Sequence, residues 1–254
     1  MMIRYIFIVY LFFLGCDSLI EKSSPLEGQF YIQDGWLAFD LKNFDDARKH
    51  FDTVLTNDMD SVTRFLAYIG LGWTDFYEAR HVEEMSSNGF VKSSGSNLDS
   101  AHKIIMSIDD KNISNDLLSL YLVGRGDLFA GLTVQRNYLA KQMSANIINW
   151  ESTNSNLADS INSIYEESII FSKQIEPDYI FKYDSSLGYI NLLILRIESL
   201  VILGKFEDAI LNYNELILEV EIDIASDCKE GVTSQKLVQC LCIITYEGNC
   251  PIDN

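Results

Sequence analysis

One pattern of large and small residues occurs twice in this chain and constrains its fold more than any other feature. Each copy places an aromatic residue, an alanine and a second aromatic residue at positions i, i+3 and i+7, which lie on one face of a helix. The two sets are Phe44, Ala47 and Phe51, and Phe206, Ala209 and Tyr213. A small residue between two large ones lets a neighbouring helix approach closely. A weaker third copy is Leu98, Ala101 and Ile105.

A second correspondence lies upstream of the first copy. Gly35-Trp36-Leu37-Ala38-Phe39 recurs as Gly72-Trp73-Thr74-Asp75-Phe76, so both segments are expected to be first helices of successive units. Tyr31 shares a helix face with Gly35, and this glycine removes a side chain where two helices would cross. Only three prolines occur, while leucine, isoleucine, alanine and charged residues are frequent. This composition favours an all-α fold over an all-β one.

Together these residues resemble the tetratricopeptide repeat (TPR), a helix-turn-helix unit of about 34 residues. The residues that carry the resemblance are Tyr31, Gly35, Phe44, Ala47 and Phe51. It implies an all-α solenoid of antiparallel helix pairs, with a concave surface that holds peptides, extended segments or partner helices, and it implies no reaction. A helical bundle without repeats is the alternative, because it also places aromatic and small residues at helical spacing.

The repeat domain is expected to span residues 28–220. A stretch rich in serine, glycine and asparagine predicts a surface loop inserted at 86–97, and a polar stretch covers 151–163. Residues 114–131 and 135–150 are interpreted as a degenerate helix pair, followed by a helix from Ser160 to Gln174.

The resemblance also implies a binding surface. Tyr31 and Gly35 would face the second helix of their unit, and in the TPR family the other side of the first helix lines the concave groove. Trp73 joins this surface as the counterpart of Trp36. The candidate binding residues are Gln29, Trp36, Asp40, Arg64, Trp73 and Asp75. The alternative is that both tryptophans pack between repeats as part of the spine.

Residues 1–15 have the features of a signal peptide. Arg4 precedes the apolar run Tyr5–Leu14, which is shorter than the roughly 20 apolar residues that span a bilayer. Phe13-Leu14-Gly15-Cys16 resembles the lipobox of bacterial lipoproteins, in which the signal is cleaved before a cysteine that carries diacylglycerol. This resemblance implies a lipid on Cys16, a tether over residues 16–27 and a location in the bacterial cell envelope, facing the periplasm or the cell exterior. An ordinary secretory signal is the alternative.

Four further cysteines lie close together in residues 221–254, namely Cys228, Cys240, Cys242 and Cys250. Their even number and crowding predict two disulfides, which suits an oxidising compartment. The simplest pairing joins Cys228 to one of the middle pair and Cys250 to the other. These bridges would hold a short C-terminal cap, residues 234–247, on the last repeat. Buried free thiols are the alternative.

The remaining composition argues against several functions. Nineteen Lys and Arg stand against 37 Asp and Glu, giving a net charge of −18. Because no basic cluster is present, nucleic acid is a poor partner. The three histidines lack metal-ligand spacing, and no serine sits in a nucleophile elbow. We therefore expect no metal, no cofactor and no catalysis.

The leading hypothesis is a membrane-anchored interaction scaffold whose partners are other envelope proteins or peptides. An alternative is a solute- or nutrient-binding lipoprotein of an outer-membrane uptake system, which would need a closed pocket. An envelope hydrolase ranks below both and would need a buried polar cluster.

Overall fold

A computed structural model describes residues 25–57, 59–81, 84–145 and 155–219, together with positions 228, 232–233, 236–237 and 239–241. The helices are α2 (Pro25–Asp40), α3 (Phe44–Thr56), α4 (Ser61–Ala79), α5 (Glu84–Ile105), α6 (Asn115–Ala145), α8 (Ser155–Ser172), α9 (Tyr189–Ile202) and α10 (Phe206–Glu219), with a 3-10 turn at Asp110–Asn112. The all-α expectation is confirmed for this part of the chain. Cys16 and the predicted signal peptide lie outside the described residues, and α2 begins within the segment predicted as a tether.

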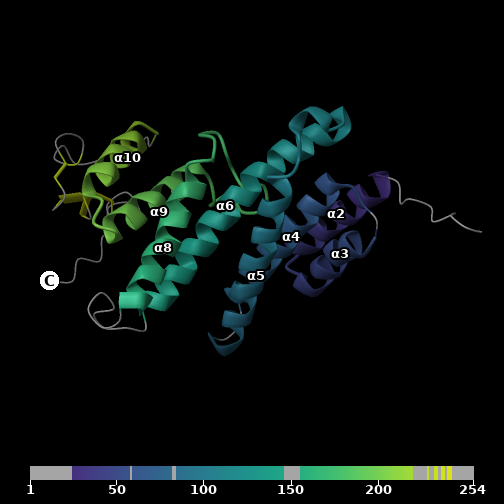
Figure 1. Ribbon diagram of the computed structural model, residues 1–254, viewed down its shortest axis with the longest axis horizontal. Coiled ribbons are helices and arrows are strands. Elements are labelled where there is room, and N and C mark those ends of the chain that lie inside the picture. The colour runs from purple at the N-terminus through teal and green to yellow at the C-terminus, as the bar shows by residue number, and fades with distance from the viewer. Residues whose placement is uncertain are drawn as a thin grey trace, which may run out of the picture.

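The helices pair in chain order, α2 with α3, α4 with α5, α6 with α8, and α9 with α10. We call the earlier member of each pair the first helix. Successive first helices contact each other, and each second helix contacts the first helix of the next pair. Contacts therefore connect neighbours along a stack, the pattern expected of repeated helical units. Figure 1 shows the pairs following one another along the long axis, from α2 and α3 to α9 and α10.

The turns within the first and last pairs have the same backbone structure. The Lys42 N–H donates to the carbonyl of Phe39, and the Gly204 N–H donates to the carbonyl of Val201. Lys42 and Gly204 both have positive φ, 59° and 69°. These positions are equivalent when Phe44 is aligned with Phe206. The match in turn geometry is independent of the side-chain pattern that suggested the repeat.

Glycines allow α2, α3 and α4 to pack around one aromatic ring. The Phe51 side chain on α3 is fully buried. A Cβ atom built on Gly35 would lie 2.6 Å from this ring, and one built on Gly70 would lie 2.3 Å from it. The predicted role of Gly35 at a helix crossing is confirmed. Gly72 has the corresponding place in the next pair, where an added Cβ would lie 2.6 Å from Leu98.

The prediction of a loop at 86–97 is wrong, because these residues belong to α5. Serine and glycine occur here because α5 packs closely against its neighbours. Ser94 is buried, and its hydroxyl donates to the carbonyl of Gly72 on α4 at 2.8 Å. An added Cβ on Gly95 would lie 2.8 Å from Gln135 on α6. Small residues such as Ser94 and Gly95, which indicate a loop when the sequence is considered alone, therefore allow α5 to pack closely against α4 and α6.

The prediction of a degenerate helix pair over 114–150 is also wrong, because α6 is one continuous helix of 31 residues. Two polar residues in its C-terminal half, Gln135 and Asn137, are buried and paired, so they do not interrupt it. Gln135 donates to the carbonyl of Val91 at 3.1 Å, and Asn137 donates to the Ser199 hydroxyl at 3.1 Å. The polar stretch predicted at 151–163 overlaps α8, which begins at Ser155, earlier than expected.

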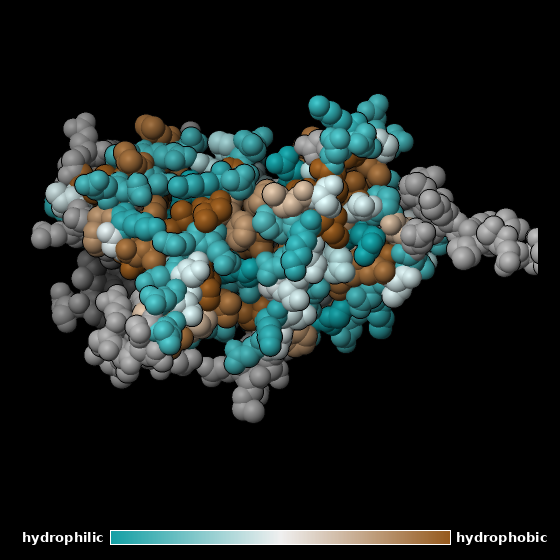
Figure 2. Space-filling model, viewed as in Figure 1, coloured by the Kyte–Doolittle hydropathy of each residue, from teal (hydrophilic) through white to brown (hydrophobic). Residues whose placement is uncertain are grey.

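By length and composition, α6 is the one described helix that could cross a membrane. Most of its apolar window is buried inside the protein, as in the core helix of a folded domain. Figure 2 shows hydrophilic side chains covering most of the face seen in Figure 1, with apolar side chains between them.

One disulfide, Cys228–Cys240, lies in the C-terminal segment. It agrees with the predicted pairing of Cys228 with one of the middle cysteines. The carbonyl of Cys228 accepts a hydrogen bond from the buried hydroxyl of Tyr213 on α10 at 3.2 Å. The segment is thereby joined to the last helix pair. Cys242 and Cys250 lie outside the described residues, as does most of the predicted cap.

The Phe51 packing gives a direct test of the helix crossings. Gly70→Ala should lower the free energy of unfolding by roughly 1–3 kcal/mol, because the new methyl group overpacks the Phe51 ring. The control is Gly89→Ala on α5, where an added Cβ meets nothing within 4 Å. This control should raise the free energy of unfolding by up to about 1 kcal/mol, because alanine has a higher helix propensity than glycine. Urea unfolding measures both, and equal effects would contradict the packing.

Candidate functional site: the first-helix face

The segment 173–188, here called the linker, connects α8 to α9 and packs across the first helices (Figure 1). Its aromatic residues alternate along the chain and reach successive helices. The Tyr179 hydroxyl donates to Asp127 Oδ1 on α6 at 3.0 Å. Phe181 stacks on Trp73 of α4 with ring centroids 4.3 Å apart, and Tyr183 stacks on Trp36 of α2 at 4.5 Å. The linker therefore covers the surface where the sequence places its candidate tryptophans.

Both candidate tryptophans are buried. Trp73 is 1% exposed, and its indole N–H donates to the carbonyl of Asp127 at 3.0 Å. Trp36 is 8% exposed and meets Phe51 as well as Phe181. The two residues share the ring of Phe181, so the structure brings them together on one surface.

The other candidate residues are dispersed. Gln29 is half-buried on α2, and Asp40 and Arg64 are exposed. Asp75 is buried and faces α3 and α5, because its carboxylate accepts hydrogen bonds from Arg48, Ser93 and Asn97. It therefore lies on the opposite side of α4 from Trp73, where it fixes one helix pair to the next.

A cavity of about 310 Å³ remains beside the linker on the first-helix face. Three first helices (α4, α6 and α9) and the linker line it together. Its aromatic and charged lining residues are Trp73, Phe76, Tyr77, Arg80, Tyr138, Lys141 and Asp184. Aromatic rings thus supply much of the lining, and two basic side chains lie at solvent-exposed positions.

The charged groups of this cavity are partly engaged. The Lys141 ammonium lies 2.7 Å from Glu198, and the Arg80 guanidinium lies over the Tyr77 ring. The Tyr77 hydroxyl donates to Asp184. Burial raises the pKa of Asp184, but hydrogen bonds from Ser186 and Tyr77 outweigh this effect and hold the pKa below its ordinary value. Asp184 is therefore a carboxylate acceptor, and Arg80 and Lys141 supply positive charge.

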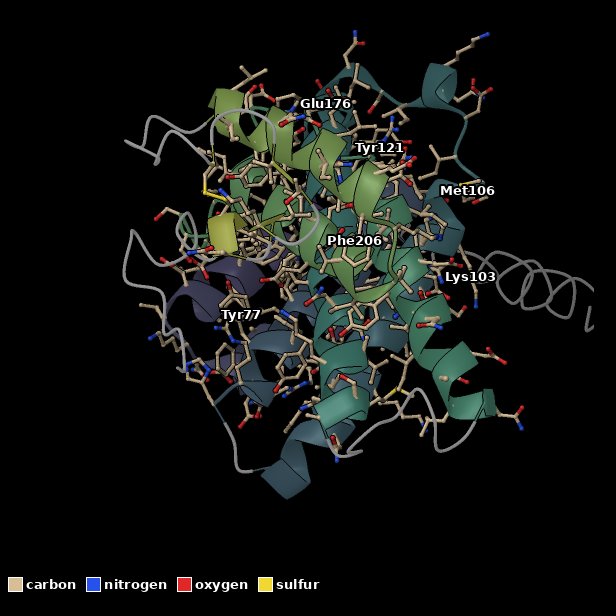
Figure 3. All side chains as sticks on the ribbon, turned by 90° about the vertical axis from the view of Figure 1, so that its left-hand side faces the viewer. Tyr77, Lys103, Met106, Tyr121, Glu176 and Phe206 are labelled. Carbon is tan, nitrogen blue, oxygen red and sulfur yellow. A yellow bond between two sulfur atoms is a disulfide. The ribbon has the colours of Figure 1, made fainter. Side chains whose placement is uncertain are left out.

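A second cavity, of about 480 Å³, lies between the N-terminal half of α6 and the linker. Its lining includes Leu122, Arg125, Asp127, Glu176 and Lys182. Figure 3 shows Glu176 and Tyr77, one residue from each cavity, well apart in the view along the long axis. The two cavities are therefore separate sites on either side of the linker.

Sequence reasoning missed the residues that shape this face. Tyr138, Tyr77 and Asp184 carry no motif, since they come from three segments far apart in the chain. The linker did carry a signal. Tyr179, Phe181 and Tyr183 alternate as in an extended segment with one buried face, although they lie between two helices.

Within the residues that the structure describes, no group of three His, Cys, Asp or Glu side chains could hold a metal ion. Searches against protein families, curated proteins and solved structures found no match to this chain.

Asp127 is the buried acid that anchors the linker. Burial raises its pKa from 3.8 to about 7, while the hydrogen bond from Tyr179 and the charge of Lys182 act in the opposite direction. The folded protein therefore holds a proton on Asp127 at pH values where the unfolded chain has lost it. Between about pH 4 and pH 7 this residue contributes stability that is lost as the pH rises.

Asp127→Asn should remove this pH dependence. The difference in unfolding free energy between wild type and variant should fall with pH, with a slope approaching about 1.4 kcal/mol per pH unit between about pH 5 and 6.5. Asparagine keeps the acceptor for Tyr179 and carries no charge, so the variant should be the more stable protein at about pH 8. Urea unfolding of both proteins across this range measures the difference. If the unfolding free energies of the two proteins changed in parallel with pH, this would contradict the burial of an ionisable Asp127.

Proposed function

We propose that the protein is a lipid-anchored, non-catalytic interaction protein of the bacterial envelope, built as a TPR-like solenoid. Its first-helix face binds segments of partner proteins. The observation that carries this proposal is the cavity of about 310 Å³ where α4, α6, α9 and the linker converge. Repeat proteins present binding surfaces along one helix layer in this way.

The cavity lining suggests what part of a partner it accepts. The rings of Phe76, Tyr77 and Tyr138 favour an apolar or aromatic side chain. Arg80 and Lys141 favour a negatively charged group beside it, such as an acidic side chain or a chain-terminal carboxylate.

The double variant Arg80→Ala/Lys141→Ala should weaken partner capture by about tenfold, equivalent to about 1.4 kcal/mol. Both side chains are exposed, so the melting temperature should change little. The matched control is Lys92→Ala/Lys103→Ala on α5, which removes the same charge from two exposed positions away from the cavity. Affinity purification of the tagged proteins from their own membranes, with quantitative mass spectrometry, measures capture. Equal loss in both variants would indicate a general charge effect and contradict the site.

Membrane anchoring is tested at Cys16. Cys16→Ala should leave an unlipidated protein whose signal peptide is not cleaved by the lipoprotein peptidase, because the thiol that would carry the diacylglycerol is absent. Mass spectrometry of the native protein should find a diacylglyceryl group on an N-terminal Cys16. An unmodified N-terminus further along the chain would refute this part of the proposal.

A second candidate function is binding of a small solute. Both cavities have volumes within the range of small-molecule sites, and the linker forms one wall of each. A small molecule that co-purifies with the wild type, and is lost in Tyr138→Ala, would favour this alternative.

A further inference from the structure

The linker is constructed so that it could leave the first-helix face as a unit. Its backbone hydrogen bonds join its own residues, as when the Phe181 N–H donates to the Leu187 carbonyl and the Leu187 N–H donates to the Asp184 carbonyl. At its base, Ile180 and Gly188 form an isolated bridge. Because these bonds stay within the linker, its movement would leave the backbone groups paired and avoid the cost of exposing them unpaired.

The contacts that hold the linker on the face are made by side chains. Tyr179 bonds to Asp127, Asp184 accepts from Tyr77, Phe181 stacks on Trp73, and Tyr183 stacks on Trp36. These contacts reach α6, α4 and α2 in turn. The linker therefore lies across three successive first helices, where an extended peptide bound to the same face would lie.

We propose that the linker is an intramolecular plug, and that the aromatic part of the first-helix face binds a partner segment only after this plug has moved away. This rests on the proposed function, since it takes the first-helix face as the binding surface. Trp36 and Trp73 are large aromatic anchors of the kind that dominate binding energies. An extended segment with aromatic side chains at alternate positions would make the contacts that Tyr179, Phe181 and Tyr183 make.

The plug sets the affinity of the face. A partner binds only the fraction of molecules in which the plug has moved, so its apparent affinity falls by that fraction. The plug is also part of the same chain and competes at an effective concentration in the millimolar range. Weakening one plug contact should therefore raise the affinity for a partner segment without adding any contact.

Hydrogen exchange of the purified protein tests whether the plug moves. Once the linker leaves the face, its internal hydrogen bonds lose the burial that protects them and open far more often than those of the helices. The amides of Phe181, Leu187 and Tyr189 should therefore exchange together and at least about tenfold faster than buried amides of α4 and α6. Tyr183→Ala should accelerate this group further, because its half-buried ring is one of the contacts. The control Ile180→Ala changes a 66% exposed residue of the same linker and should leave the rates unchanged. Exchange of the linker amides only together with those of α4 and α6 would overturn the proposal.

A synthetic peptide of residues 176–187 tests the vacated face. It should bind Tyr183→Ala at least about tenfold more tightly than the wild type or Ile180→Ala, as measured by fluorescence anisotropy. A peptide with alanine at 179, 181 and 183 should not bind. Equal affinity for all three proteins, or no binding to any, would overturn the proposal. Both experiments use the isolated protein and the covered tryptophans, so a failure of the Arg80 and Lys141 site would leave their outcome unaffected.

Discussion

The stack of Phe181 on Trp73 decides how much of the first-helix face is open to solvent. It places a linker from the third helix pair on a tryptophan of the second pair, and Phe181 then reaches Trp36 of the first. Because this ring is fully buried, the aromatic surface beneath it is closed. The part of this face that stays open is the cavity beside the linker, which is why the proposed binding site is placed there.

The stack depends in turn on how closely the helices approach one another. Glycines at the crossings set this distance, with Phe51 between Gly35 and Gly70, and Leu98 against Gly72. Half-buried arginines then connect helices of the stack. Arg48 joins α3 to Asp75 on α4, and Arg136 joins α6 to Asp99 on α5 and Glu167 on α8. Asp75 is the buried carboxylate of this set, so removal of Arg48 would leave it without the ion pair that offsets the cost of its burial.

The sequence predicted the features that depend on local periodicity. Ala47 and Ala209 mark second helices because a small residue between two aromatic ones at helical spacing is typical of a close helix crossing, and both alanines are fully buried. The predictions from the sequence were wrong where tertiary contacts override the local preference of a segment for loop or helix. Ser94 and Gly95 favour a loop when taken alone, yet they lie in α5 because α4 and α6 leave room only for small side chains. The same holds for Gln135, whose polar side chain is buried because Val91 accepts its hydrogen bond.

The candidate site was predicted only in part, for a related reason. Helix geometry placed Trp36 and Trp73 on a common surface, and they do share one. The linker that covers them lies far along the chain from both, and no periodicity within a single helix reports such a contact. Asp75 lies close to Trp73 in sequence but about 200° around the helix axis, so it faces Arg48 and the second helices.

The most direct test of this account is the stability of Phe181→Ala. If the ring is packed between Trp73 and Trp36, its removal should lower the free energy of unfolding by about 3–5 kcal/mol through the cavity that remains. The emission of the newly exposed tryptophans should shift to longer wavelength in the folded protein. A loss below about 1 kcal/mol, with unchanged tryptophan emission, would mean that the linker does not cover the first-helix face and would contradict the account.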